Sequence, residues 1–279
     1  MNEHRDDGTR KDAQRRDTNT GQRSPWPDTL YIVRHGESAG NVARDAAIAA
    51  RSEMIDLSIR DVDVPLSERG ERQATALGHW FAQLPGGERP DIVLSSPYVR
   101  ARQTGNGVLA ALRGEAGESD VVACVHDERL REKEFGILDR MTTFGIRERY
   151  PELAEQRRHV GKFYFRPPGG ESWCDVILRL RSFLDMLSRE HRGDRVLVVG
   201  HQVIVNCMRY LLERLDEQEI LAIDRIGDVP NCGITSYEFD PHAGRRGKLV
   251  LRLENFVSPL REAGAAVTAE PDRPAAAKP

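Results

Sequence analysis

Two histidines directly follow two apolar stretches of the chain. The stretch 30–33 leads into Arg34 and His35, and the stretch 195–199 leads, through a glycine, into His201. In open α/β sheets the carboxyl ends of parallel strands meet at the edge where ligands bind, so we expect both imidazoles there. An arginine beside a histidine suits an oxyanion such as phosphate, because the planar guanidinium offers paired donors and stays charged.

Two more charged residues fall at predicted strand-to-helix junctions. Arg100 follows the predicted strand 91–94, and Glu132 follows the predicted strand 121–125. One histidine at a strand end is more often structural, but two at equivalent ends with these charged neighbours are hard to attribute to chance. Phosphoryl transfer needs cations for the phosphoryl oxygens, a nucleophile and an acid for the leaving group. The sequence therefore predicts a phosphoryl-transfer site.

The elements that hold these residues alternate between strand and helix. Ser67 suits the N-cap of a helix through Phe81, in which apolar residues recur at a spacing near 3.6. Strands are predicted at 28–33, 91–94, 121–125, 195–199, 235–239 and 248–256. Further helices are predicted from Asn41 onward and at 100–112, 143–150, 171–190 and 207–212. The pattern predicts a three-layer α/β/α sandwich with a mostly parallel central sheet.

The composition is that of a globular protein with polar extensions. Of the 279 residues, 39% are hydrophobic and 30% are charged, a length that fits one large domain or two small ones. Residues 1–27 carry few apolar side chains, and residues 261–279 are rich in Ala, Pro and Glu. Such segments bury too little surface to offset their ordering entropy. We therefore predict one domain over 28–260 between two disordered tails.

Several classes of protein are disfavoured by charge and composition. The net charge of −3 lacks the strong positive balance of a nucleic-acid-binding protein. No apolar run is long enough to span a membrane, and the N-terminal stretch lacks the apolar core of a signal peptide. The four cysteines are widely spaced, unlike a metal site or a disulfide framework. We expect a cytoplasmic protein with reduced thiols and no bound metal, and the sequence leaves open whether it forms a homo-oligomer.

The order of the motifs resembles the histidine phosphatase superfamily, which contains the cofactor-dependent phosphoglycerate mutases and many phosphatases. The resemblance extends from Thr29 to Phe239. Each motif is weak evidence alone, but all of them occur in the family order. The motifs are Arg34-His35-Gly36-Glu37 with Asn41, then 65–70, 95–104, 130–136, 169–172 and Gly200-His201.

This resemblance implies a mechanism that fits the residue types. His35 would be the nucleophile and form a phosphohistidine, which requires a neutral ring whose other nitrogen is held by an acceptor. Arg34, Arg100 and His201 would hold the phosphoryl oxygens and absorb charge in the transition state. Glu132 would protonate the leaving group and then activate water.

The resemblance also assigns a supporting residue and implies that no metal or cofactor is needed. Asn41 would add a hydrogen bond to the phosphoryl group. Glu134 is a rival for the acid, and Arg102 is a rival for the arginine, but the family spacing favours Glu132 and Arg100. The other histidines are expected to be surface or packing residues.

Three functions remain open at this point. The favoured one is hydrolysis of a small phosphorylated metabolite, the second is a cofactor-dependent phosphoglycerate mutase, and the third is an inactive phosphate-binding module. The mutases carry a long insertion with an arginine pair after the acid motif. Here only a short stretch separates Gly136 from Gly169, and the pair Arg157 and Arg158 has a different context. All the expected catalytic residues are present, which disfavours the inactive module.

Residues 162–172 are similar to the fructose-2,6-bisphosphatase domain. That subgroup has an arginine where this chain has Asn206, so specificity for a bisphosphate is not implied. Segment 42–64 is longer than the family pattern, and its position suggests a lid over the site. The resemblance makes four residues candidates for substrate recognition: Lys162, Tyr164, Arg166 and Gln202.

Overall fold

The computed structural model describes residues 24–116 and 123–269, and these residues form a six-stranded sheet in the order β3-β2-β4-β1-β5-β6. The first four strands in this order are parallel, and β5 and β6 are antiparallel to their neighbours. The predicted, mostly parallel α/β architecture is confirmed. The strands are β1 (Thr29–Arg34), β2 (Ile92–Ser95), β3 (Ala123–His126), β4 (Arg195–Gly200), β5 (Ile234–Asp240) and β6 (Lys248–Phe256).

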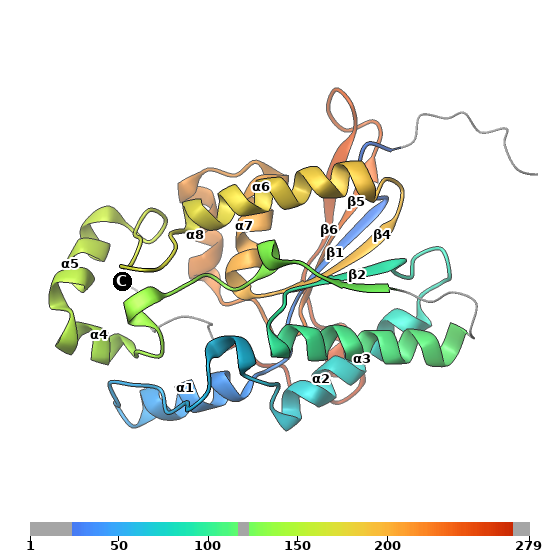
Figure 1. Ribbon diagram of the computed structural model, residues 1–279. Coiled ribbons are helices and arrows are strands. Elements are labelled where there is room, and N and C mark those ends of the chain that lie inside the picture. The colour runs from blue at the N-terminus through green and yellow to red at the C-terminus, as the bar shows by residue number, and fades with distance from the viewer. Residues whose placement is uncertain (1–23, 117–122, 270–279) are drawn as a thin grey trace, which may run out of the picture.

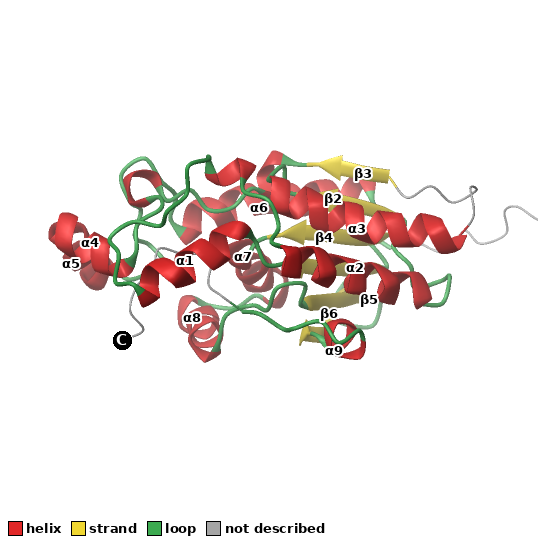
Figure 2. Cartoon of the chain, turned by 90° about the horizontal axis from the view of Figure 1, so that it is seen from below, coloured by secondary structure: helices red, strands yellow, loops and turns green. Residues whose placement is uncertain are grey.

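Helices cover both faces of this sheet and extend beyond its carboxyl edge (Figure 1). Helices α6 and α7 lie on one face, while α2 and α3 lie on the other, where Figure 2 shows them in front of the strands. Helices α1, α4 and α5 lie beyond the edge. The bounds are α1 (Ala39–Ala49), α2 (Glu68–Gln83), α3 (Val99–Ala116), α4 (Thr143–Arg149), α5 (Pro151–Val160), α6 (Trp173–Glu190), α7 (Gln202–Glu213), α8 (Glu217–Ile226) and α9 (Ser258–Glu262).

The central strands are apolar on both faces because each face packs against helices. In β1, Leu30 and Ile32 belong to the core cluster that contains the apolar residues of α6 and α7. The alternate residues Tyr31 and Val33 pack with those of α2 and α3. Continuous apolar strands of this kind are typical of a buried parallel sheet. Because the central strands are held on both faces, the residues that follow them lie at the carboxyl edge of the sheet.

Side-chain caps set the start of the two helices that flank the site. Ser67 caps α2 by accepting a hydrogen bond from Gly70 N at 3.1 Å, as the sequence predicts. Ser172 caps α6 in a capping box with Asp175. Such caps satisfy donors that a helix N-terminus leaves open.

The predicted end of the domain at residue 260 is wrong. Helix α9 continues to Glu262, Ala265 packs against the α2/α3 core, and Thr268 is buried. At the other end, Trp26 packs against the core, so the domain also begins slightly before residue 28. These short segments dock through a few long-range contacts, which composition does not reveal.

Other differences are local. Helices α5, α8 and α9 were not predicted from the sequence. The predictions for residues 1–23, 121–122 and 270–279 lie outside the described residues. In the part of the chain that the structure describes, no helix is long and apolar enough to cross a membrane.

Candidate active site

His35 lies fully buried at the carboxyl end of β1 with both ring nitrogens engaged. Its Nδ1 lies 2.6 Å from Gly36 O, and its Nε2 lies 3.2 Å from Arg100 Nε. A carbonyl oxygen only accepts and a guanidinium only donates. The ring is therefore the neutral tautomer with the proton on Nδ1 and the lone pair on Nε2. This is the protonation state that a histidine nucleophile requires.

His201 and Glu132 complete the same buried cluster. The rings of His35 and His201 lie 5.1 Å apart between centroids. Glu132 Oε2 lies 3.8 Å from His201 Nδ1, and both side chains are at most 1% exposed. His201 Nε2 lies 2.8 Å from the hydroxyl of Ser96. The structure thus brings together the predicted nucleophile, the second histidine and the predicted acid.

The two predicted arginines are anchored from different directions. Arg34 is fully buried, and its Nη1 donates to Val229 O at 2.7 Å. Arg100, at the start of α3, donates from Nη1 to Asp61 O at 2.7 Å and from Nη2 to Asp61 Oδ2 at 3.1 Å. Asp61 therefore holds the outer end of Arg100 while Nε faces the nucleophile.

Asp61 is a site residue that the sequence did not predict. It lies in segment 42–64, and a cavity of about 70 Å³ is lined by Ile55, Leu57 and Asp61 of this segment together with Arg100 and Glu132. The segment thus forms one wall of the site. Its action as a lid stays a prediction.

Helix α1 contributes two more polar residues to the same cavity. Asn41 and Arg44 both line it, and both are 3% exposed. The amide oxygen of Asn41 accepts from Ser38 N and Oγ, each at 2.9 Å. The predicted hydrogen bond from Asn41 to a phosphoryl group would therefore use its side-chain NH₂ group.

The loop after His35 packs directly against the N-terminus of α2. A Cβ on Gly36 would lie 2.6 Å from Gly70 O, and one on Gly70 would lie 1.9 Å from Glu37 O. The Glu37 carboxylate accepts from Ser67 Oγ at 2.6 Å and from Arg69 Nη1 at 2.8 Å. Both glycines are needed for this approach of two backbones, and Glu37 holds the loop in place.

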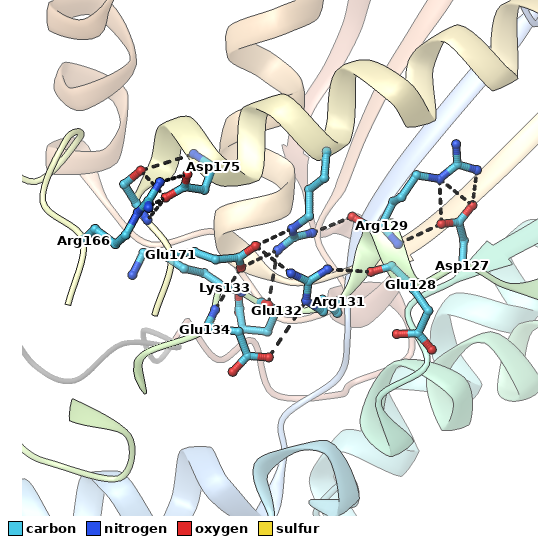
Figure 3. A network of polar contacts seen from close by, with 12 residues as sticks. Asp127, Glu128, Arg129, Arg131, Glu132, Lys133, Glu134, Arg166, Glu171 and Asp175 are labelled. Atoms are coloured by element: carbon cyan, nitrogen blue, oxygen red, sulfur yellow. Dashed lines mark hydrogen bonds and ion pairs between the residues drawn. The ribbon is translucent and has the colours of Figure 1, made fainter. Parts of the chain in front are cut away.

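The loop that carries Glu132 is connected to α6 by ion pairs of Glu171 (Figure 3). Glu171 accepts from Arg131 Nη2 at 2.7 Å and from Arg179 Nε at 3.0 Å. It also accepts from Glu134 N at 3.0 Å. Arg179 in turn donates to Glu132 O at 3.3 Å. The Gly-Gly-Glu-Ser motif therefore positions the backbone of the acid loop.

Burial separates the predicted residues from their rivals. The Glu134 side chain is 49% exposed and pairs with Arg131, whereas Glu132 is 1% exposed beside His201. Arg102 is exposed, whereas Arg100 reaches His35. Glu132 and Arg100 therefore lie in the buried cluster with His35 and His201, and their catalytic roles stay predictions.

Three of the four candidate recognition residues have other surroundings. Lys162 pairs with Asp224, and Tyr164 is 54% exposed. Arg166 Nε donates to Asp175 at 2.7 Å, and Figure 3 shows it turned toward that residue. None of the three is among the described residues that line the cavity. Their roles in recognition stay predictions.

Gln202 lies next to His201 in the chain but is oriented by the loop that follows α8. It is 2% exposed, and its Nε2 donates to Asp228 Oδ1 at 2.8 Å. Asn206, one helical turn later in α7, donates to Asp224 at 3.4 Å. The position that carries an arginine in the fructose-2,6-bisphosphatase domain is thus part of a polar cluster with an aspartate.

Replacing Asp61 with asparagine is expected to tighten binding of inorganic phosphate about tenfold, since a nearby like charge is removed. The backbone carbonyl of residue 61 and an amide oxygen still accept from Arg100, so the guanidinium keeps its place. The measurement is the inhibition constant of phosphate. Asp63→Asn is the matched control, because Asp63 lies on the same turn but pairs with Arg60. Equal inhibition constants in Asp61→Asn and the wild type would contradict this role.

Lys133 follows the acid and carries an unusual pKa. Burial lowers the pKa of its ammonium to about 8, partly offset by Glu132. In the unfolded chain this group titrates near 10.5. Between pH 8 and 10.5 the unfolded state therefore binds more protons than the folded state. Below pH 8, keeping Lys133 charged in its buried position lowers the free energy of unfolding by about 3 kcal/mol.

Replacing Lys133 with methionine is expected to raise the free energy of unfolding at pH 7. The gain should shrink by about 2 kcal/mol by pH 9.5, because the penalty in the wild type fades as pH rises from 8 toward 10.5. Denaturant titrations at several pH values measure this difference. Lys248→Met, at an exposed position, is the control. A gain that does not depend on pH would contradict the assignment.

Comparisons with known proteins agree with this geometry. Residues 30–250 match the model of the histidine phosphatase superfamily, branch 1. A 2,3-bisphosphoglycerate-dependent phosphoglycerate mutase of Rhizobium etli is 33% identical over 200 residues, which are 70% of this chain and 85% of that protein. A 6-phosphofructo-2-kinase/fructose-2,6-bisphosphatase of Caenorhabditis elegans is 30% identical over 191 residues, 67% of this chain but 35% of that protein.

A solved structure shows the same fold. The mycobacterial glucosyl-3-phosphoglycerate phosphatase, solved with VO3, superposes with a TM-score of 0.62 at 23% identity, covering 82% of this chain and 99% of that one. The family model spans most of the chain, and the motif residues converge on one buried site. The predicted membership is confirmed: the chain belongs to the histidine phosphatase superfamily.

Proposed function

We propose that this protein is a phosphatase that hydrolyses a small phosphomonoester through a phosphohistidine, without a metal ion or cofactor. The observation that carries the proposal is the orientation of His35. Its Nδ1 proton is held by Gly36 O, so the Nε2 lone pair is presented beside Arg100. The buried pair of Glu132 and His201 lies next to it. A nucleophile, cations and an acid within one buried cluster support phosphoryl transfer.

In the first step, His35 Nε2 attacks phosphorus in line with the leaving oxygen. The N–P bond forms as the P–O bond to the leaving group breaks, and Glu132 gives its proton to the departing oxygen. Arg34, Arg100 and His201 bind the phosphoryl oxygens, where charge develops. The Arg100 Nε–H moves from the His35 lone pair to a phosphoryl oxygen in this step, which frees the nucleophile as substrate binds.

In the second step, water attacks the phosphohistidine. Glu132, now a carboxylate, takes a proton from that water as the O–P bond forms and the N–P bond breaks. Inorganic phosphate leaves, and His35 returns to the tautomer held by Gly36 O. Using one carboxyl first as an acid and then as a base follows from microscopic reversibility.

A phosphatase is favoured over a mutase by the segment between the acid loop and α6. After a single 3-10 turn at Gly136–Leu138, this segment contains the two short helices α4 and α5. On α5, Arg158 pairs with Glu155, and its side chain is 76% exposed. An exposed arginine with a local partner is poorly placed to hold the carboxylate of a phosphoglycerate. The mutase remains the second candidate, since the relative from Rhizobium etli carries that name.

The test is phosphate release from a panel of phosphomonoesters with a chelator present. The panel contains sugar phosphates, sugar bisphosphates, phosphoglycerates and p-nitrophenyl phosphate. Metal-independent release supports the proposal, and the best substrate identifies the subgroup. Interconversion of phosphoglycerates without release would favour the mutase.

We also infer a cytoplasmic location, which the four free cysteines support.

A further inference from the structure

The two peptide groups that flank Gly36 are held by two side-chain amides. Asn231 Nδ2 donates to His35 O at 2.9 Å. Glu37 N donates to Gln73 Oε1 at 2.8 Å. The second of these peptide groups contains Gly36 O, the acceptor of the His35 Nδ1 proton. The amides of Asn231 and Gln73 therefore fix the backbone that selects the tautomer of the nucleophile.

Thr268 joins these two amides from a segment distant in the sequence. Gln73 Nε2 donates to Thr268 Oγ1 at 2.9 Å, and Thr268 Oγ1 donates to Asn231 Oδ1 at 3.0 Å. Asn231 and Gln73 are fully buried, and Thr268 is 8% exposed. A hydroxyl can accept one hydrogen bond and donate another, which a valine of the same shape cannot do.

The donors in this chain all point in one direction. Glu37 N–H donates to Gln73, Gln73 to Thr268, Thr268 to Asn231, and Asn231 to His35 O. Each amide thereby has one orientation, because its oxygen and its NH₂ group face partners of opposite kind. Buried networks in which every member is satisfied are rigid and specify one arrangement.

We propose that Thr268 is a positioning residue for the nucleophile, and that the segment after α9 is part of the active-site framework. Without the Thr268 hydroxyl, Asn231 Oδ1 loses its donor and Gln73 Nε2 loses one of its acceptors. Thr104 Oγ1 still accepts from Gly36 N at 3.0 Å, but the peptide group that contains Gly36 O is held less firmly through Gln73, and so is the Nδ1 proton of His35. A larger share of His35 then carries its proton on Nε2, where it blocks attack on phosphorus.

The segment itself stays docked when the hydroxyl is removed. Asn231 N donates to Thr268 O at 2.8 Å, and Gln73 Nε2 donates to Ala266 O at 2.8 Å. Both bonds use backbone oxygens, so a substitution at Thr268 leaves them intact. The effect of the hydroxyl can therefore be separated from loss of the segment.

The experiment compares Thr268→Val and Thr268→Ser with the wild type. We expect Thr268→Val to lower kcat about tenfold with KM within about twofold, because a small displacement of a reacting group is costly. Thr268→Ser restores the hydroxyl and should stay within about threefold of the wild type. Val267→Ala is the control in the same segment, since Val267 is 40% exposed, and it should retain full activity.

A second readout does not depend on the reaction. In protein with ¹⁵N-labelled histidine, the ring nitrogens of His35 report the tautomer directly, and His35→Ala identifies their signals. Thr268→Val should shift these signals toward a mixture of tautomers, and Thr268→Ser should not. The kinetic part rests on the proposed function, whereas the spectra decide the inference even if no substrate is found.

Three results would overturn the inference. One is an unchanged tautomer and kcat in folded Thr268→Val. Another is Thr268→Ser behaving like Thr268→Val, which would mean that the methyl group matters rather than the hydroxyl. The last is an equal loss in Val267→Ala. Thr268→Ala removes the same hydroxyl with less bulk and takes the place of the valine variant if that variant does not fold.

Discussion

Replacing His35 with alanine is expected to abolish turnover of every phosphomonoester that the wild type hydrolyses. The imidazole supplies the bond to phosphorus, and no other group in the described cluster of His201, Glu132 and the arginines has a nucleophilic lone pair in the same place. The loss should be at least about six orders of magnitude, the lower range of enzymatic rate enhancement. Phosphate release over long incubations measures it.

The same variant tests the covalent intermediate. Wild-type protein quenched in alkali after brief exposure to a labelled substrate should retain the label, because phosphohistidine survives in base. His35→Ala should retain none. His79→Ala is the control, since His79 is exposed on α2. Residual turnover well above background in His35→Ala, or a label that stays in place, would refute the assignment of the nucleophile.

The residues at strand ends could be predicted from the sequence because their signals are local. An apolar run followed by a polar residue marks where a buried strand leaves the sheet, which places His35 and His201 at one edge. Ser67 and Ser172 cap their helices through residues three positions later. The family motifs also distinguish Glu132 from Glu134, which charge alone does not.

Residues that reach the site from distant segments could not be predicted. Asp61 lies in a polar stretch whose composition resembles an ordinary loop, and its role depends on a contact with Arg100, 39 positions away. Thr268 is bonded to Gln73, 195 positions away. No periodicity or capping pattern precedes either contact. The docking of each segment against the folded domain determines these positions.

The candidate recognition residues show that a role inferred from a family resemblance depends on the local partners of each residue. Arg166 and Lys162 match a subgroup of the family, yet in this chain they pair with Asp175 and Asp224. A residue with such a partner can reach a substrate only if that ion pair breaks. The cavity wall formed by Asp61 and Arg44 is built from the segment in which this chain departs from the family pattern. The residues that determine substrate specificity are therefore better sought in segment 42–64.

Replacing Glu132 with glutamine is expected to lower kcat by about 10² to 10⁴ for alkyl phosphates, the range of general acid–base catalysis. Glutamine keeps the shape and the hydrogen bond that residue 132 accepts from Lys133 N at 2.7 Å, but it can neither give nor take the proton. Glu134→Gln is the matched control. The Glu134 carboxylate is 49% exposed and pairs with Arg131, whereas that of Glu132 is buried beside His201, so kcat of Glu134→Gln should remain close to that of the wild type.

The two roles of Glu132 can be separated with p-nitrophenyl phosphate, whose leaving group departs without a proton. Glu132→Gln should then form the phosphohistidine readily but hydrolyse it slowly, because the attacking water has lost its base. The expected trace is a burst of one nitrophenolate per active site followed by slow turnover. Equal slowing of the burst and the steady state would show that Glu132 acts in binding or orientation rather than in proton transfer. A large loss in Glu134→Gln instead would transfer the role of the acid to the exposed carboxylate.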